Sequence, residues 1–245
     1  IRGVVKGIIA ERRRAEGDRG DLLSMLLLAV DEEGDGGRMT DEQACDEAVN
    51  LMLGGNETTA TALTWSLYLL AANPAAQDEL RHEVDEVLGA ASAPTDETLP
   101  RLRGVERAFK EAMRLYPPAW TTGRQANEDV TIGGYHIPKG SQMLASQWVV
   151  HRDARFFPDP EAFDPDRWEP ERAKQIPRYA YFPFGGGPRI CIGNHFAMLE
   201  ATLILAIVLR RYHFELLPGQ TLTFNPSVTL RQRGPGLKMR VHAQR

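Results

Sequence analysis

Cysteine is scarce in the 245 residues, which contain only Cys45 and Cys191. Two thiols cannot form the disulfide framework of a small secreted domain, so a reducing compartment or a single functional thiol is favoured. Long hydrophobic runs are also missing. The longest uncharged run, residues 58–77, contains an Asn-Pro break and several hydroxyl side chains, which is typical of a buried helix and not of a membrane span.

The chain has no initiator Met, and helical spacing begins at Ile1 without a cap, which indicates a missing N-terminal part. Excess positive charge is absent too: the net charge is −4 and the pI is near 5.9. These values argue against nucleic acid as a main partner, because such partners need a basic face. Five lysines against 24 arginines are typical of a GC-rich bacterial source. We therefore expect a cytoplasmic protein, although an anchor in a missing N-terminal part would not be visible.

Hydrophobic periodicity predicts a chain that is mainly α with a minor β part. Thr40 and Gln43 form a capping box, and the helix that follows has no stop before Asn73-Pro74, which makes it roughly 50 Å long. A helix over residues 21–30 is apolar almost all round and is expected to be buried. Other helices are predicted over residues 1–15, 74–89, 104–115 and 194–211, and strands over 130–132, 135–137, 142–146, 212–217, 227–230 and 238–242. Residues 152–192 are expected to be mostly irregular.

The middle of the long helix is built from poor helix formers, Gly54-Gly55-Asn56-Glu57-Thr58-Thr59. Such a break with local rules in a buried helix indicates a functional or strained site. The alternative is a kink at which the glycines allow close helix packing and Glu57 pairs with a base. The six residues alone leave both interpretations open.

A second unusual stretch runs from Phe184 to Gly193 and contains three consecutive glycines and a proline. These residues exclude a helix or a central strand, and an apolar helix follows them. Cys191 therefore lies where a glycine-rich loop enters a helix N-terminus, which favours a thiolate. A haem iron would suit such a thiolate. The alternatives are half a zinc site with His195, a Cys–His hydrolase, or a structural cysteine. We favour haem, because no second ligand pair exists, His195 is poorly placed on the same helix, and a structural cysteine needs no glycines.

At each fixed position, Phe184-x-x-Gly187-x-Arg189-x-Cys191-x-Gly193 resembles the haem-binding signature of the cytochrome P450 superfamily. Four further segments match in the family's order: residues 54–59, 111–114, 151–153 and 163–168, with Trp168 where the family mostly has Phe. The resemblance implies a cytochrome P450 fold, mainly α with minor β and N-terminally truncated. Residues 1–245 would form a single partial domain, lacking the first helices, the first sheet strands and the lid.

The resemblance also implies a haem b cofactor with Cys191 as its axial thiolate and metal ligand. Glycines would keep side chains away from the porphyrin, Phe184 would pack beside the sulfur, and arginines would bind the propionates. The residues implied for haem binding are Cys191, Arg189, Arg124, Phe184, Gly185, Gly187, Gly193 and His151. Glu57 and Thr58 would be the catalytic proton-relay pair. The substrate pocket would include Leu51, Gly54, Ala119, Trp120, Thr121 and Val228.

Glu111 and Arg114 lie three residues apart on a predicted helix, and such a pair is usually a surface ion pair. The resemblance instead places them with Arg167 in a structural triad that holds the core together and does not react.

The implied reaction inserts one oxygen atom of O₂ into an organic, apolar substrate. Two electrons would come ultimately from NAD(P)H through a ferredoxin or flavoprotein reductase. The alternatives are a peroxide-using or rearranging relative, and a catalytically incompetent fragment. An acidic electron donor would dock on a basic patch near Cys191. The residues expected in this patch are Arg152, Arg155, Arg172, Lys174 and Arg178.

Overall fold

The computed structural model describes residues 1–15, 17–30, 36–91, 93–234 and 236–244. The chain divides into two compact units, residues 1–57 and residues 58–245. The long helix α3 (Asp41–Ala72) contributes its first part to the first unit and the rest to the second. Its length confirms the helix expected between Thr40 and Asn73. In the described part of the chain, no helix combines the length and the apolar character needed to cross a membrane.

The first unit consists of α1 (Arg2–Arg14), α2 (Leu22–Leu28) and the start of α3. The capping box is confirmed: the Thr40 N–H donates to Gln43 Oε1 at 2.9 Å, and the Gln43 N–H donates to Thr40 Oγ1 at 3.2 Å. The expectation that the second helix is buried all round is wrong, because Met25 is 66% exposed and only Ser24 and Leu27 are buried. A helix this short can bury only one face against the small core of this unit.

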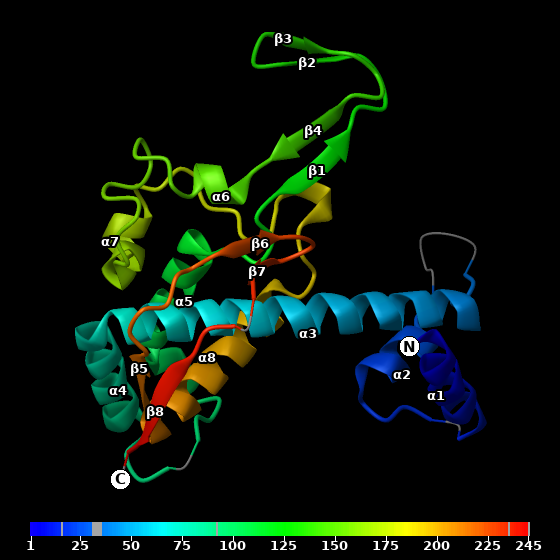
Figure 1. The fold of residues 1–245 in the computed structure, drawn as a ribbon. Helices are drawn as coiled ribbons and strands as arrows, with labels where there is room; N and C mark the ends of the chain where they lie inside the picture. Colours follow the sequence, from blue (N-terminus) through cyan, green and yellow to red (C-terminus); the bar gives the residue numbers. More distant parts are fainter. Residues whose placement is uncertain (16, 31–35, 92, 235, 245) are drawn as a thin grey trace. The chain divides into compact units, whose positions relative to one another are not determined.

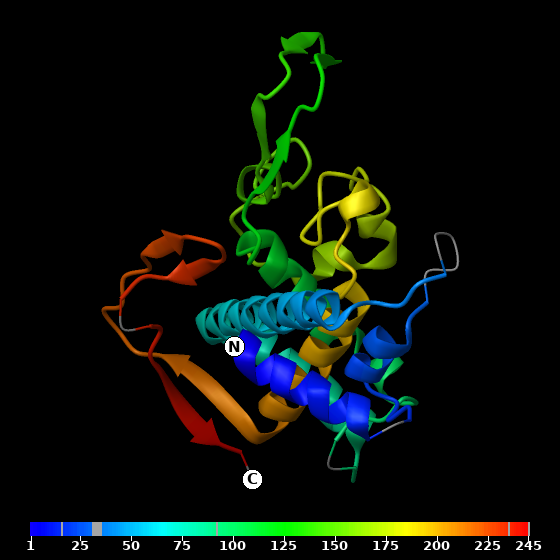
Figure 2. The same cartoon turned by 90° about the vertical axis from the view of Figure 1, so that its right-hand side faces the viewer.

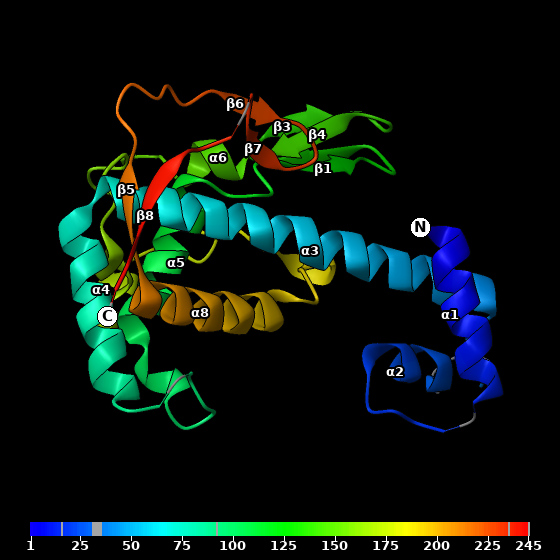
Figure 3. The same cartoon turned by 60° about the horizontal axis from the view of Figure 1, so that its bottom comes forward.

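Four helical segments form the main core of the second unit: the end of α3, α4 (Pro74–Leu88), α5 (Arg103–Leu115) and α8 (Asn194–Arg211). Helix α8 packs against both α4 and α5 (Figure 3). Pro74 at the first position of α4 and Gly89 after its end confirm that helix. Glu83 of α4 caps α5, because its carboxylate accepts the N–H groups of Gly104 at 2.7 Å and Val105 at 3.0 Å.

Short helical turns fill the connections of the second unit. They are η1 (Leu99–Arg101), α6 (Gln147–Val150), η2 (Pro165–Trp168), α7 (Pro170–Ala173) and η3 (Gly187–Arg189). The last three lie within residues 152–192, which are otherwise irregular as expected. Helix α5 lies against η2, and this contact brings the loop after α6 over the buried face of α5.

Among the described residues, eight strands form four antiparallel pairs. They are β1 (Thr122–Gln125) with β4 (Gln142–Ala145), β2 (Val130–Ile132) with β3 (Tyr135–Ile137), β5 (Tyr212–Leu216) with β8 (Met239–Ala243), and β6 (Phe224–Pro226) with β7 (Leu230–Gln232). The β2–β3 hairpin continues beyond the β1–β4 pair (Figure 1), whereas β6–β7 lies between β5 and β8 in the chain (Figure 2).

The strand expected over residues 227–230 is wrong, since most of this segment is the turn that joins β6 to β7. The sequence does not indicate β6, because this short strand ends in Asn-Pro and shows no alternation of apolar and polar residues. β1 was not expected at all. Gln77 of α4 fixes the position of β5: its fully buried side chain accepts the Phe214 N–H at 2.7 Å and donates to the Phe214 carbonyl at 3.0 Å.

Candidate functional site

The loop that carries Cys191 is closed by its own backbone hydrogen bonds. The Cys191 N–H donates to the Phe184 carbonyl at 2.9 Å, and the Gly185 N–H donates to the Phe182 carbonyl at 2.9 Å. Gly185 and Gly187 have φ values of 73° and 68°, which only glycine adopts without strain. The glycines therefore allow a tight loop that leaves the free thiol of Cys191 exposed.

Apolar side chains flank this thiol on the chain. Ile190 and Ile192 are exposed, the latter at 88%, and Phe196 is exposed on the first turn of α8. Phe184, in contrast, is partly buried and packs against the main core of the second unit. The loop is thus anchored by one aromatic ring, while its outer side presents an exposed apolar surface of the kind that marks a binding site.

The residues present fit a haem group. Such a group requires an accessible thiol as a ligand, apolar surroundings for its ring and a cation for its propionates. Arg189 is exposed and makes no hydrogen bond or ion pair within the described part of the chain, and Arg124 donates only to the Gly123 carbonyl, at 2.8 Å. A side chain at Gly193 would put its Cβ 3.9 Å from the sulfur of Cys191.

The other interpretations of Cys191 find no support. No three His, Cys, Asp or Glu side chains among the described residues are grouped so that they could hold a metal ion, which counts against a zinc site with His195. His195 itself is exposed, and its backbone N–H donates to Asn194 Oδ1. Cys45 is the buried structural cysteine, since it belongs to the core of the first unit.

Glu111 and Arg114 form a buried ion pair and not a surface one, so the expectation drawn from their spacing alone is wrong. Both side chains are 0% exposed. Arg114 Nε and Nη2 donate to the two carboxylate oxygens of Glu111 at 2.9 and 2.8 Å. Spacing could not show this burial, because the covering loop comes from residues about 40 to 55 positions further along the chain.

The hydrogen-bonding groups of this pair are saturated. Arg114 also donates to the carbonyls of His151 at 2.9 Å, Pro160 at 2.6 Å and Ala162 at 2.9 Å. Glu111 also accepts from Arg167 Nε at 3.3 Å, from the Asp164 N–H at 3.1 Å and from Trp168 Nε1 at 3.0 Å. The three residues of the implied triad are therefore brought together, and Trp168 adds a donor that a phenylalanine would lack. A buried ion pair is stable only with such complete partnering.

His151 lies at the edge of this network and not on an exposed face. Its ring is fully buried between the rings of Tyr181 and Phe182, and Nε2 accepts the Phe182 N–H at 2.9 Å. Burial and then the neighbouring Arg114 guanidinium lower the pKa of His151 to about 3. No ring nitrogen is exposed to bind a propionate, so we do not retain His151 as a haem contact.

Helix α3 continues without a break through residues 54–59. A Cβ added at Gly54 or Gly55 would meet no atom within 4 Å in the described part of the chain, so the structure gives no support to a close-packing kink. Glu57 and Thr58 are half-buried; Glu57 is the last residue of the first unit and Thr58 the first residue of the second. Their role in catalysis stays a prediction.

Two segments expected in the substrate pocket lie together. The indole N–H of Trp120 donates to the Ser227 carbonyl at 2.9 Å, and the Leu230 N–H donates to the Pro118 carbonyl at 2.9 Å. Val228, at the tip of the β6–β7 turn, is 89% exposed. Ala119 and Thr121 are half-buried beside Trp120, whereas Leu51 and Gly54 belong to the first unit. The pocket assignment itself stays a prediction for all six residues.

The basic patch expected near Cys191 is largely neutralised. Arg152 is half-buried and lies 3.5 Å from the ring centre of Trp148, while Arg178 lies over the ring of Tyr179. Four of the five cations have carboxylate partners: Arg152 with Glu161, Arg155 with Asp153, Arg172 with Asp164 and Lys174 with Glu171. The acidic residues interleaved in this segment cancel the charge that a count of arginines suggests.

Comparison with known proteins accounts for this arrangement. A family model described as Cytochrome P450 matches residues 1–239. Cyclooctatin synthase of Streptomyces melanosporofaciens is 49% identical over 215 residues, which are 88% of this chain and 46% of that protein. Cyclooctat-9-en-7-ol 5-monooxygenase of the same organism is 40% identical over 222 residues, 91% of this chain and 48% of that protein. The chain spans about half the length of the curated relatives it matches.

A crystal structure of the cytochrome P450DA haem domain superposes with a TM-score of 0.93 at 34% identity. The match covers 100% of this chain and 53% of that one. The mainly α fold with minor β strands, expected from the resemblance, is thereby confirmed. With a family match that extends over nearly all of its residues, this chain belongs to the cytochrome P450 family.

Proposed function

We propose that the chain is the cysteine-bearing part of a haem-thiolate monooxygenase that oxidises an apolar organic substrate. The observation that carries the proposal is the exposed thiol of Cys191 in a loop that two left-handed glycines keep tight. Bound haem would supply the binding and activation of O₂. The remaining tasks belong to the side chains of this chain.

Cys191 would hold the iron, since its thiol is free and exposed. Arg189 and Arg124 would hold the propionates through charge-assisted hydrogen bonds, since neither has a carboxylate partner in the part of the chain that is described. Phe184, packed on the core, would keep water from one side of the sulfur. Glycine at 185, 187 and 193 leaves room for a flat group.

Glu57 and Thr58 would deliver protons, the carboxylate as the exchangeable group and the hydroxyl as the group that holds water or substrate oxygen. This pair also favours an O₂-using enzyme over a peroxide-using or rearranging relative. Electrons would come from NAD(P)H through a ferredoxin or a flavoprotein. The donor would have to dock without a strongly basic patch, since most of the expected cations are already paired.

The substrate is proposed to be a cyclic apolar molecule. Support comes from cyclooctat-9-en-7-ol 5-monooxygenase, whose name gives such a molecule as its substrate and which shares 40% identity with this chain. The pocket wall would include residues 119–121 and the β6–β7 turn at Val228, which the Trp120–Ser227 hydrogen bond ties together.

The test is the spectrum of the reduced protein with CO, recorded after expression with excess haem. We expect the red-shifted Soret band of a thiolate-ligated haem. It should be lost in Cys191→Ala and kept in Cys45→Ala, whose cysteine is buried in the first unit. A band that survives Cys191→Ala would refute the ligand assignment.

The same spectrum should also be recorded for this chain fused to the part of cyclooctatin synthase outside the match. Haem in the fusion but not in the chain alone would identify the chain as an incompetent fragment of an active enzyme. Haem in neither protein would refute the proposed function.

A further inference from the structure

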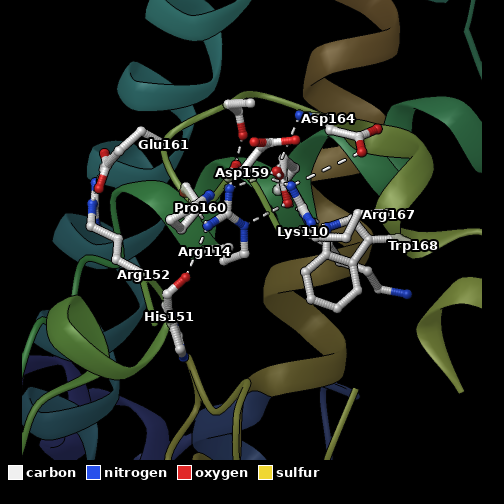
Figure 4. A network of polar contacts seen from close by, with 12 residues as sticks. Lys110, Arg114, His151, Arg152, Asp159, Pro160, Glu161, Asp164, Arg167 and Trp168 are labelled. Atoms are coloured by element: carbon white, nitrogen blue, oxygen red, sulfur yellow. Dashed lines mark hydrogen bonds and ion pairs between the residues drawn. The ribbon is translucent and has the colours of Figure 1, made fainter. Parts of the chain in front are cut away.

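The imidazole of His151 joins two parts of the second unit that are distant in sequence. Its Nε2 accepts the N–H of Phe182, the residue just before the cysteine loop, at 2.9 Å. Its backbone carbonyl accepts Arg114 Nη1 at 2.9 Å. One residue thereby connects the buried Glu111–Arg114 pair to the start of the loop, with its carbonyl directed toward Arg114 (Figure 4).

The hydrogen bond at Nε2 fixes the state of the ring. An imidazole nitrogen that accepts an amide N–H carries no proton, so the proton of the neutral ring lies on Nδ1. Nδ1 is buried and has no hydrogen-bond partner among the described residues, so Nε2 makes the one hydrogen bond of the ring. The charged groups that act on the ring are Arg114 and Arg152, and both disfavour its protonation.

A continuous series of short backbone contacts leads from Phe182 to the thiol-bearing residue. The Phe182 carbonyl accepts the Gly185 N–H at 2.9 Å, and the Phe184 carbonyl accepts the Cys191 N–H at 2.9 Å. Between them, the Ile190 N–H donates to the Gly187 carbonyl at 3.1 Å. The loop is thus closed on itself, and the His151 ring holds the amide at its entrance.

Packing alone does not explain a histidine at this position. A phenyl ring would fill the space between Tyr181 and Phe182 equally well, with the ring contacts that His151 makes at 5.1 and 5.2 Å. It would leave the part-buried Phe182 N–H without its partner, and an unpaired donor shielded from water is costly. The requirement at this site is therefore an acceptor in the place of Nε2.

We propose that His151 is a positioning residue for Cys191: its neutral imidazole holds the amide of Phe182, just before the cysteine loop, and so sets the geometry in which the thiol is presented. The inference rests on the proposed function only in taking Cys191 as the iron ligand. The geometry of the loop can be measured without haem.

Two substitutions separate the two ring nitrogens. In His151→Gln the side-chain oxygen reaches the place of Nε2 and accepts the Phe182 N–H. In His151→Asn the amide nitrogen replaces only Nδ1, and nothing reaches Phe182. The pair is matched in polarity and charge, so a difference between the variants reports the acceptor alone.

Amide hydrogen exchange of the 245-residue chain is the first measurement. In His151→Asn we expect the amides of Phe182, Gly185 and Cys191 to exchange about fivefold to a hundredfold faster than in the wild type, the range that one unpaired buried donor implies. Amides of α5 and α8 should be unchanged, and His151→Gln should match the wild type.

The second measurement is the thiolate-ligated fraction of the CO spectrum in the haem-loaded protein, which should fall in His151→Asn and recover in His151→Gln. Unchanged exchange at Cys191 in His151→Asn would overturn the inference. Equal acceleration in α5 would also overturn it, because His151 would then serve the fold as a whole. The inference would also be overturned if these loop amides exchanged faster in His151→Gln while the amides of α5 stayed unchanged. If neither the wild-type chain nor its fusion takes up haem, the proposed function fails, but the exchange measurement still decides this inference.

Discussion

Arg114→Lys is the sharpest test of the buried network, because it keeps the positive charge and changes the number and direction of the N–H donors. A guanidinium has five N–H donors in a fixed plane, and all five of Arg114 are used: two on Glu111 and three on the carbonyls of His151, Pro160 and Ala162. An ammonium group has three donors that diverge from one point. At least two of the five hydrogen bonds of Arg114 would therefore be lost.

Each lost hydrogen bond of this buried, charged donor costs roughly 1–3 kcal/mol, so the loss for Arg114→Lys should be about 2–6 kcal/mol in the free energy of unfolding. At about 2–4 °C per kcal/mol for a chain of this size, Tm should fall by about 4–24 °C. A loss of this size is a large fraction of the roughly 5–15 kcal/mol that stabilises a typical domain.

Urea denaturation followed by circular dichroism, together with calorimetry, measures both quantities. Arg107→Lys is the matched control on the same helix, since Arg107 forms its ion pairs with Asp166 and Glu169 near the surface. The control should cost less than about 1 kcal/mol. If Arg114→Lys were no more destabilising than Arg107→Lys, the geometry of the five donors would not be what stabilises this core.

Three further perturbations have defined outcomes. Gly104→Ala should lower the free energy of unfolding by about 1–3 kcal/mol in urea titrations, because the new Cβ would lie 2.8 Å from Glu83 Oε2; an unchanged midpoint would show that Glu83 moves away freely. The pKa of His151 is lowered in the folded state from the ordinary 6.5 to about 3. The unfolded chain therefore binds the extra proton, and the stabilisation from the neutral ring is complete above pH 6.5 and is lost as the pH falls toward 3. Between pH 6.5 and pH 3, the free energy of unfolding of the wild type should fall by about 4 kcal/mol more than that of His151→Gln. The same dependence on pH in both proteins would contradict this. Thr58→Ala should raise peroxide release relative to product in the haem-loaded enzyme, whereas Thr64→Ala, whose exposed hydroxyl bonds the Ala60 carbonyl, should not; equal coupling in both variants would remove Thr58 from the proton relay.

Local sequence signals predicted those elements whose determinants are local. The helix at residues 194–211 has its expected bounds, because it lies between a glycine-rich loop and a strand and is rich in apolar residues. The start of α3 follows from Thr40 and Gln43, which satisfy each other's backbone groups without any distant partner. The β2–β3 hairpin follows from its Gly-Gly turn.

The errors concern burial and pairing, which depend on distant residues. The spacing of Glu111 and Arg114 is the same in a surface pair and in a buried one, and only the loop that covers α5 decides between them. The apolar residues of α2 suggested burial on all sides, yet a short helix has too few neighbours to cover Met25. The glycine-rich loop before α8 could be predicted, but the hydrogen bond between Phe182 and the His151 ring could not, because no spacing rule connects residue 151 to residue 182.

The buried ion pair and the exposed thiol belong to one polar structure. Glu111 fixes Arg114, Arg114 holds the carbonyl of His151, and the ring of His151 holds the entrance of the loop that ends at Cys191. Each of these contacts lies within residues 58–245, the second compact unit. A reactive cysteine on an exposed glycine-rich loop would otherwise have little to fix its direction, since glycine adds conformational freedom. Under the proposed function, the rigidity that Cys191 would need as a metal ligand would come from the fully paired charges of Glu111 and Arg114, which reach its loop through His151.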